Sequence, residues 1–347
     1  MHGRRRRPSR RGRRRGGDLG REGARGGGGR HGPDHRLRGA HARGPAGPES
    51  LRPGRAGRGG PDPARRGRVR RPAVRVAFQG ERGAHSEEAV VRLFGEVEVV
   101  PCASLRDAFE AVAGGRADRG VVPVENSQAG SINETYDLLL AYTLVIAGEF
   151  DHRVVHCLMA LPGQARAAIT RVYSHPQALA QCDVYLRRAG MEPVSYYDTA
   201  GSAKMIQEQR LLGCGAIASR RAARLYDLEV LDEGIETNPN NYTKFLVIGT
   251  AAAPRAAQSK TSIVFVVANE PGSLYRALGT LATRRINLVK IESRPGRTRP
   301  WDYTFYVDID GHVEDVRIRE ALDDLQRQTT FLRVLGSYPR SPAPAPS

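Results

Sequence analysis

The sequence has few of the features that mark a disulfide scaffold, a cysteine metal site or a membrane protein. It contains four cysteines and one tryptophan in 347 residues. The cysteines are widely spaced and lie in apolar or helix-like stretches, which predicts buried free thiols at Cys102, Cys157, Cys182 and Cys214. No run of about 18 apolar residues occurs, so no membrane span is expected. Free thiols without a span favour a cytoplasmic protein.

The excess of positive over negative charge is confined to the beginning of the chain. The formal net charge is +17, but residues 1–72 contain 23 arginines, no lysine and 5 acidic residues, so the other 275 residues are nearly neutral. Arginine- and glycine-rich tails bind RNA through phosphate contacts, yet this one has no aromatic residue for base stacking. We therefore expect no nucleic-acid partner. We also expect a disordered head, either a solvated tail or residues upstream of a mis-assigned start.

From residue 73 onward, strand-like and helix-like runs alternate. "VRVAFQG" (74–80) leads into "SEEAVVRLF", and "GVVPV" (120–124) leads into "SINETYDLLLAY". This alternation predicts a mainly parallel α/β domain over 73–252. Residues 260–338, after a polar linker, have the element order β-α-β-β-α-β of a ferredoxin-like domain. The tail 339–347, which ends in "SPAPAPS", is expected to be disordered.

Small polar side chains follow several of the predicted strands. Glu125, Asn126 and Ser127 follow one strand, and Ser174 and His175 lie at the end of another. In open α/β sheets the carboxyl ends of the strands line the ligand crevice, and helix N-termini at that edge favour anions. The pattern predicts a site for a small ligand with more than one carboxylate.

Structural interpretations of the same residues remain open. The segments Ser131–Glu134 and Ser174–Gln177 both fit the capping box, in which the first and fourth side chains satisfy free N–H groups at a helix start. Turn stabilisation, ion pairing or a scaffold role is the alternative for Asn126, Ser127, Glu125 and His175.

Taken together, the motifs that follow the arginine-rich head resemble one known family. Residues 74–337 are similar to prephenate dehydratases that carry a C-terminal ACT regulatory domain. The similar stretches of the larger part are "VAFQGERGAHSEEA", "VVPVENSQAGSINETYDLLL", "YSHPQALAQC", "DTAGSAK", "GAIAS" and "NNYTKFLVIG". Those of the small part are "NEPGSLYRAL" and "INLVKIESRP".

The resemblance implies a catalytic domain like a two-lobed periplasmic binding protein, with its second lobe at about residues 152–236 and substrate between the lobes. The family's reaction removes the ring carboxylate of prephenate as carbon dioxide and its C4 hydroxyl as water, giving phenylpyruvate without cofactor or metal. Thr243, in "NYTKF", falls on the family's catalytic threonine, whose hydroxyl donates toward the departing oxygen. Lys244 stands where arginine is usual, which would weaken a carboxylate contact but would be neutral beside a structural partner.

The remaining site residues are also implied by the resemblance. The expected substrate-binding residues are Glu125, Asn126, Ser127, Ser174, His175, Gln177, Thr199, Ala200, Lys244 and Phe245, although packing explains Phe245 more readily. The expected phenylalanine-binding residues are Pro271, Gly272, Ser273, Leu274, Asn287, Leu288, Ile291, Glu292 and Ser293. L-Phenylalanine is the expected feedback inhibitor, and pairing of ACT domains implies a homodimer or homotetramer. The alternatives are an arogenate dehydratase and a non-catalytic amino-acid sensor.

Overall fold

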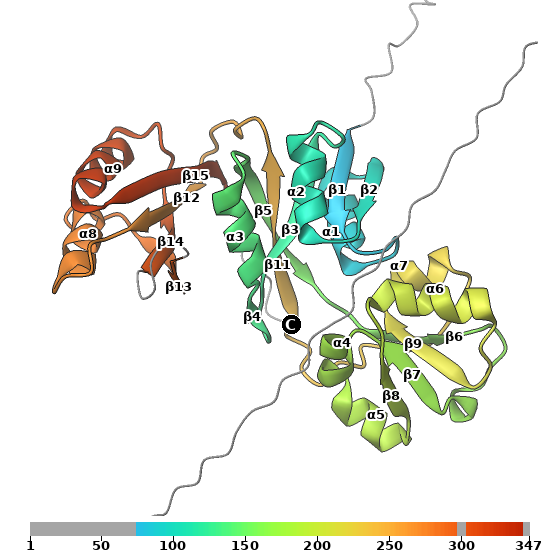
Figure 1. The fold of residues 1–347 in the computed structure, drawn as a ribbon. Helices are drawn as coiled ribbons and strands as arrows, with labels where there is room; N and C mark the ends of the chain where they lie inside the picture. The colour runs from blue at the N-terminus through green and yellow to red at the C-terminus, as the bar shows by residue number, and fades with distance from the viewer. Residues whose placement is uncertain (1–73, 297–302, 343–347) are drawn as a thin grey trace, which may run out of the picture. The chain divides into compact units, whose positions relative to one another are not determined.

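The computed structural model of the chain describes residues 74–296 and 303–342 (Figure 1). The expectations for the arginine-rich head and for residues 343–347 lie outside this part. Within it, Pro339 ends the last strand and Arg340 pairs with Asp310, so the tail expected from residue 339 begins too early. No helix within it is long and apolar enough to cross a membrane. All four cysteines are buried and free, as predicted.

The first lobe is built on a sheet of strand order β2-β1-β3-β11-β5, with a short strand β4 beside β3. Strands β1 to β3 are parallel to one another, whereas β11 runs antiparallel to both β3 and β5. The strands are β1 Arg75–Gln79, β2 Glu98–Cys102, β3 Arg119–Asn126, β4 Gly130–Ser131, β5 Val145–Arg153 and β11 Tyr242–Gly249. The helices are α1 His85–Phe94, α2 Leu105–Ala113 and α3 Asn133–Ala141.

Strand β11 divides the core of this lobe, because successive side chains of a strand point to opposite faces. Phe245 and Val247 pack into an apolar cluster that includes Phe78 of β1 and Val90 of helix α1. Leu246 and Ile248 pack on the other side with residues of α2 and α3. Thr243 and Lys244, earlier on the same strand, are therefore directed to different faces.

The second lobe has its own sheet, of strand order β10-β6-β9-β7-β8. Strands β7, β8 and β9 are parallel, while β6 and β10 are antiparallel to their neighbours. The mainly parallel sheet expected from the alternation is thus mixed in both lobes, since β6, β10 and β11 return across the sheets. The strands are β6 Cys157–Ala160, β7 Arg171–Ser174, β8 Glu192–Ser195, β9 Cys214–Ala218 and β10 Glu229–Glu233. The helices are η1 Arg166–Ala168, α4 Pro176–Gln181, α5 Asp183–Ala189, α6 Thr199–Gln209 and α7 Arg220–Leu225.

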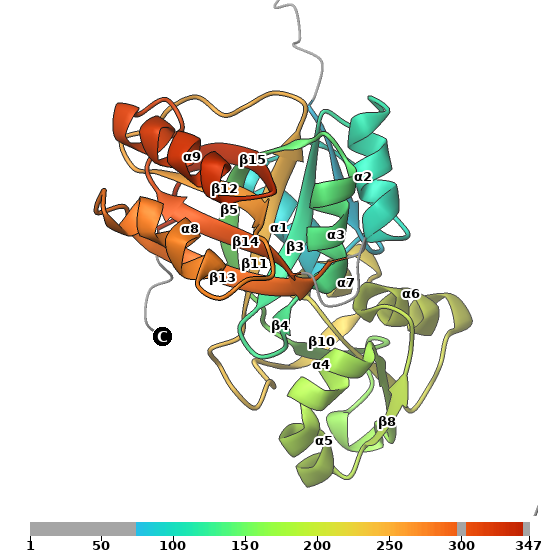
Figure 2. The same cartoon turned by 60° about the vertical axis from the view of Figure 1, so that its left-hand side comes forward.

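The C-terminal domain has the predicted ferredoxin-like order, and its sheet runs β13-β14-β12-β15. Helices α8 and α9 cover one face of this sheet, and the other face is directed to the first lobe (Figures 1 and 2). Tyr306, Leu335 and Tyr338 of that face belong to the same apolar cluster as Leu246 and Ile248. The elements are β12 Ser259–Val266, α8 Ser273–Ala282, β13 Leu288–Pro295, β14 Tyr303–Asp310, α9 Val316–Gln328 and β15 Phe331–Pro339.

A close approach of two backbones fixes this contact. Strand β15 crosses β5 so tightly that a Cβ atom on Gly336 would lie 2.1 Å from the carbonyl oxygen of Ile146. No side chain fits there, so glycine is required for the domain to pack against β5.

Candidate active site

The ends of β3 and β11 bring Asn126 and Thr243 together. The two residues pair in the antiparallel register, and Asn126 Nδ2 lies 3.0 Å from Thr243 Oγ1. Asn126 is 5% exposed, so its amide is held in a largely dry environment. The structure therefore unites the expected catalytic residue with one of the expected substrate-binding residues.

The orientation of the Asn126 amide is determined by its other contacts. Its Oδ1 accepts hydrogen bonds from the backbone N–H groups of Gln128 and Ala129, at 3.1 and 3.0 Å. Backbone N–H groups only donate, so the oxygen must face them and Nδ2 must face Thr243. Thr243 Oγ1 is consequently the acceptor of this bond, and its own hydrogen is available for another partner.

Ser127 stabilises the turn that follows β3. Its hydroxyl donates to Asn240 O and accepts from Tyr242 N, both at 3.0 Å, and its backbone N–H donates to Tyr242 O at 2.8 Å. These bonds fix the segment immediately before Thr243. The geometry favours the turn-stabilising interpretation of Ser127, although it leaves the residue beside the site.

A chain of side-chain amides connects this point to the second lobe. Asn126 Nδ2 also donates to Asn241 Oδ1 at 2.9 Å, and Asn241 Nδ2 donates to Gln181 Oε1 at 3.0 Å. The same Gln181 oxygen lies 2.8 Å from His156 Nε2, which must then carry the hydrogen. None of Asn241, Gln181 and His156 was predicted, although Asn241 and Gln181 lie within the matching motifs.

A buried group of histidines lies on the Thr243 side of the sheet. His152 is directly opposite Thr243 in the β5–β11 register, and its side chain is fully buried. Its Nε2 lies 3.3 Å from Glu88 Oε2, which is also 3.4 Å from His85 Nδ1. The ring of His156 meets that of His85 edge-on, with 5.4 Å between their centroids. In the sequence, the only sign of this group is a pair of histidines four positions apart, His152 and His156 in "DHRVVHC".

Burial governs the protonation of these histidines. It lowers the pKa of His152, and it lowers the pKa of His156 to about 4. Burial also opposes ionisation of Glu88, but the adjacent His152 and His85 hold the pKa of its carboxyl well below the usual range. At neutral pH the group therefore contains an ionised carboxylate and neutral imidazoles at His152 and His156.

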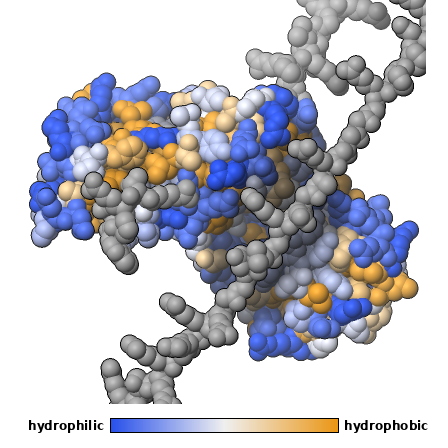
Figure 3. Space-filling model, in the orientation of Figure 1, coloured by the Kyte–Doolittle hydropathy of each residue, from blue (hydrophilic) through white to orange (hydrophobic). Residues whose placement is uncertain are grey.

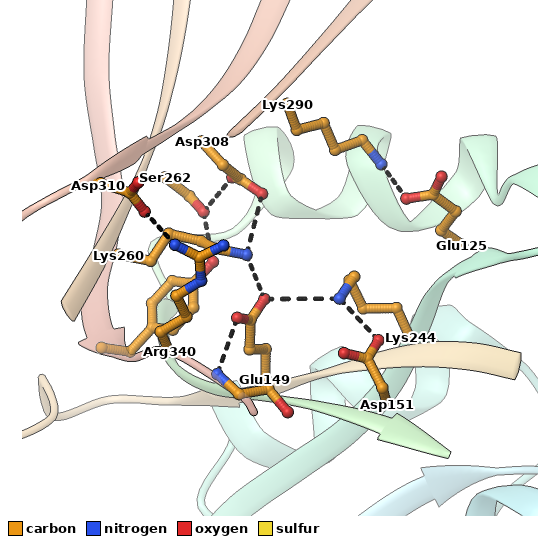
Figure 4. A network of polar contacts seen from close by, with 12 residues as sticks. Glu125, Glu149, Asp151, Lys244, Lys260, Ser262, Lys290, Asp308, Asp310 and Arg340 are labelled. Carbon is orange, nitrogen blue, oxygen red and sulfur yellow. Dashed lines mark hydrogen bonds and ion pairs between the residues drawn. The ribbon is translucent and has the colours of Figure 1, made fainter. Parts of the chain in front are cut away.

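Two expected substrate-binding residues point to the opposite face, toward the C-terminal domain. Lys244 Nζ lies 2.7 Å from Asp151 Oδ1 and 3.9 Å from Glu149 Oε2 (Figure 4). Glu125 forms an ion pair with Lys290 of β13, with 2.5 Å between Oε2 and Nζ. The structure therefore favours the structural alternatives considered for both residues, since their charges are already paired away from Thr243.

In the second lobe, some of the expected substrate-binding residues are buried and bonded to the protein, and others are exposed. Ser174 is fully buried and donates to Ile217 O at 2.6 Å. His175, which is exposed, is the N-cap of α4, where its Nδ1 accepts from Gln177 N. The capping box predicted from Ser174 is therefore wrong, because the helix begins one residue later. The box predicted from Ser131 is wrong for the same reason, since α3 begins after Ile132.

The start of α6 contains Thr199 and Ala200. The cap of this helix is Asp198, whose Oδ1 accepts from Gly201 N at 2.8 Å. Ala200 is fully buried, and Phe245 is 2% exposed within the core. Packing therefore accounts for Phe245, as the sequence interpretation favoured.

The expected phenylalanine-binding residues come from the start of α8 and from β13. Gly272 is the N-cap of α8 with φ 80°, and Arg276 donates to Ser273 Oγ and to Pro271 O. Asn287 Nδ2 donates to Asp310 Oδ2 at 2.8 Å. Glu292 instead accepts from Ser131 Oγ of the first lobe at 3.0 Å. This group thus connects the C-terminal domain with the strand end that carries Asn126. The remaining members are Leu274, Leu288, Ile291 and Ser293, of which Ile291 and Ser293 are exposed.

Comparison with known proteins identifies the two parts of the chain. The profile of the prephenate dehydratase family matches residues 76–253, and that of the ACT domain matches residues 261–327. The chain belongs to the prephenate dehydratase family. Membership in this family of lyases sets aside the alternative of a non-catalytic sensor.

Named relatives and solved structures agree with this assignment. Arogenate dehydratase 1 of Petunia hybrida is 45% identical over 290 residues, covering 78% of this chain and 68% of the relative. Arogenate dehydratase/prephenate dehydratase 2, chloroplastic, of Arabidopsis thaliana is 44% identical, with coverages of 77% and 73%. The prephenate dehydratase of Arthrobacter aurescens in complex with L-Phe superposes with a TM-score of 0.71 at 32% identity, covering 77% of this chain and 90% of that one.

Two findings qualify the expectations. The structure of GqqA, named a novel type of quorum quenching acylase, superposes with a TM-score of 0.73 at 35% identity, covering 77% of this chain and 98% of that one. Because different activities are named for one fold, function has to be argued from the site.

The expected cytoplasmic location is contradicted, since several of the matching Arabidopsis thaliana relatives are named chloroplastic.

Proposed function

We propose that this protein catalyses the decarboxylating dehydration of prephenate, with Thr243 donating a hydrogen bond to the departing C4 oxygen. The supporting observation is the bond from Asn126 Nδ2 to Thr243 Oγ1, which occupies a lone pair of the hydroxyl and leaves its hydrogen available. As the C–CO₂ bond breaks, its electrons complete the aromatic ring and expel the C4 oxygen. That oxygen takes a proton and leaves as water. A donor placed at this oxygen stabilises the charge that develops there.

Asn126 is the positioning residue in this proposal. Its amide is fixed by two backbone N–H groups and by Asn241, so it directs the threonine hydroxyl without reorganisation during the reaction. Ser127 supports the same turn. The exposed His175 and Gln177, together with Thr199, remain the proposed contacts from the second lobe.

Arogenate is the second candidate substrate, because relatives 45% and 44% identical to this chain are named arogenate dehydratases. Arogenate differs from prephenate in carrying an amino acid where prephenate has a keto acid. The reacting ring is the same, so Thr243 would have the same role in both.

The deciding experiment supplies purified protein with each substrate in turn. Phenylpyruvate is followed by its ultraviolet absorbance, and phenylalanine from arogenate is followed by chromatography. We expect turnover with prephenate. Turnover of arogenate alone would replace the proposed substrate, and turnover of neither compound would refute the proposed activity.

We also propose L-phenylalanine as the inhibitory effector, bound by the start of α8 and by β13. This is supported by the ACT profile and by the L-Phe complex of the Arthrobacter aurescens protein. Adding phenylalanine to the same assay tests it: inhibition is expected, and an unchanged rate at saturating phenylalanine would contradict it.

A pairing of ACT domains through the edge strand β13 is the proposed basis of a homodimer or homotetramer. Strand β13 lies at the edge of its sheet, where Val289 and Ile291 are 36% and 42% exposed and Tyr303 of β14 is 44% exposed. Apolar side chains lie on the face of this domain seen in Figure 3. Light scattering after size exclusion distinguishes monomer, dimer and tetramer. A monomer in the presence of phenylalanine would contradict the proposed pairing.

A further inference from the structure

The buried group around His152 has the geometry of a metal site. His85 Nδ1 and His152 Nε2 lie 3.4 and 3.3 Å from Glu88 Oε2, and one ligand atom from each of the three residues lies within 4.8 Å of the others. In a tetrahedral zinc site with bonds of about 2.0–2.1 Å, neighbouring ligand atoms are about 3.4 Å apart. The two measured separations agree with that spacing.

The ring nitrogens of His85 and His152 lack hydrogen-bond partners among the described residues. None of the ring nitrogens of His85 and His152 makes a hydrogen bond of acceptable geometry to any other described residue, although all four atoms are buried. His152 is fully buried, so bulk solvent does not reach its ring. Buried polar groups without partners are costly and rare, and they require an explanation at each site where they occur.

We propose that His85, Glu88 and His152 bind one divalent ion of the zinc class. Two imidazoles and one carboxylate form a donor set used for zinc, with a fourth position left for another ligand. Nitrogen donors favour zinc, cobalt or nickel, whereas magnesium and calcium prefer sites made entirely of oxygen.

The charges of the group suit a cation. Glu88 supplies a carboxylate whose Oε2 lies near a ring nitrogen of both histidines. An imidazole in its neutral form presents a lone pair to a metal. Helix α1 supplies two of the ligands and β5 the third, so the ion would join the helix to the sheet.

Access to the site is limited. A cavity of about 500 Å³ reaches Glu88 between α1 and α7, and four arginines line it: Arg92, Arg220, Arg221 and Arg224. Positive charge at the opening opposes the entry of a cation, so slow uptake is expected. The proposed dehydration does not use this ion, and binding is therefore measured separately from turnover.

The experiment uses the full chain, freed of metals with a chelator that is then removed, and incubated for hours with Co²⁺ or Zn²⁺. Co²⁺ is expected to bind with a stoichiometry of one and to give visible absorption bands of a four-coordinate site. Zn²⁺ is expected to displace it and to raise the melting temperature. A wild-type protein that shows neither the bands nor the rise in melting temperature would overturn the proposal.

Variants locate the site. E88Q and H85Q are expected to lose the Co²⁺ bands and to bind Zn²⁺ at least about tenfold more weakly, whereas H312Q is expected to bind like the wild type. His312 is the matched control, because it is another buried histidine near a glutamate, 3.7 Å from Glu314, in the C-terminal domain. Histidines of residues 1–72 are present in every variant, so the difference between E88Q and wild type isolates this group. Wild-type bands in E88Q with native circular dichroism would assign the metal elsewhere and overturn the proposal.

Discussion

Lys244 Nζ lies 2.7 Å from Asp151 Oδ1, on the opposite face of β11 from Thr243. The next carboxylate, Glu149, is shared with Lys260 of the C-terminal domain at 2.6 Å (Figure 4). A single strand therefore carries the proposed catalytic hydroxyl on one side and an ionic contact with the regulatory domain on the other. Because Thr243 and Lys244 are adjacent in β11, a movement of this domain that displaces Lys244 would also displace the backbone of Thr243.

The first prediction concerns K244M. Because Lys244 is paired within the ionic network, we expect the KM for prephenate to change by less than about threefold, while inhibition by phenylalanine weakens. Steady-state kinetics with and without phenylalanine measure both quantities. K204M is the control, since Lys204 forms a partly exposed ion pair with Glu81, 3.4 Å apart, in another part of the chain. A KM raised more than about tenfold with unchanged inhibition would instead place Lys244 against the substrate.

The second prediction concerns the hydroxyl of Thr243. T243A is expected to lower kcat by about 100-fold, because it removes a donor from the departing oxygen, whereas T243S is expected to keep most of the activity. The melting temperatures of the two variants should be similar, because Thr243 lies at the end of β11. An unchanged kcat in T243A would remove the residue from the mechanism.

The third prediction tests how Asn126 directs that hydroxyl. In N126D a carboxylate oxygen replaces Nδ2, so it accepts the hydroxyl hydrogen of Thr243 and turns it away from the substrate. We expect kcat to fall at least about tenfold. Combining N126D with T243A should cost less than about threefold beyond T243A alone, because both changes remove one interaction. Fully additive losses would mean that the two residues act independently.

The order of elements was predictable from the sequence, and so was part of the site. Alternating runs indicated the lobes, and the β-α-β-β-α-β order indicated the C-terminal domain, since both signals are local. The Asn126–Thr243 contact joins residues 117 positions apart, so only resemblance could suggest it. The opposite directions of Thr243 and Lys244 were readable from strand periodicity. The meeting of His85 with His152 depended on how α1 packs on β5, which no local pattern encodes.

The fourth prediction concerns the contact between β15 and β5. A methyl group in G336A would overlap the carbonyl oxygen of Ile146, so the strands must separate, and we expect a loss of at least about 2 kcal/mol in the free energy of unfolding. Urea unfolding measures it. G279A is the matched control, because a Cβ there meets nothing within 4 Å and Gly279 lies inside α8, where alanine is favoured by about 1 kcal/mol. Equal stability of G336A and wild type would show that β5 and β15 are less tightly packed.

The fifth prediction is a pH dependence of stability due to His156. Its pKa is about 4 in the folded protein, where burial and the nearby His85 disfavour the charged ring, against 6.5 for an unperturbed histidine. The unfolded chain therefore binds the proton more readily. The contribution of His156 is fully present above pH 6.5 and is lost as the pH falls toward 4, by about 2 kcal/mol between pH 7 and pH 5.

Urea unfolding of wild type and H156Q at these two pH values, in the presence of a chelator, measures this contribution. The wild type should lose about 2 kcal/mol more than H156Q on acidification, because glutamine does not titrate. H175Q should behave like the wild type, since His175 is exposed. Equal acid sensitivity of H156Q and wild type would mean that His156 becomes protonated in the folded protein without cost.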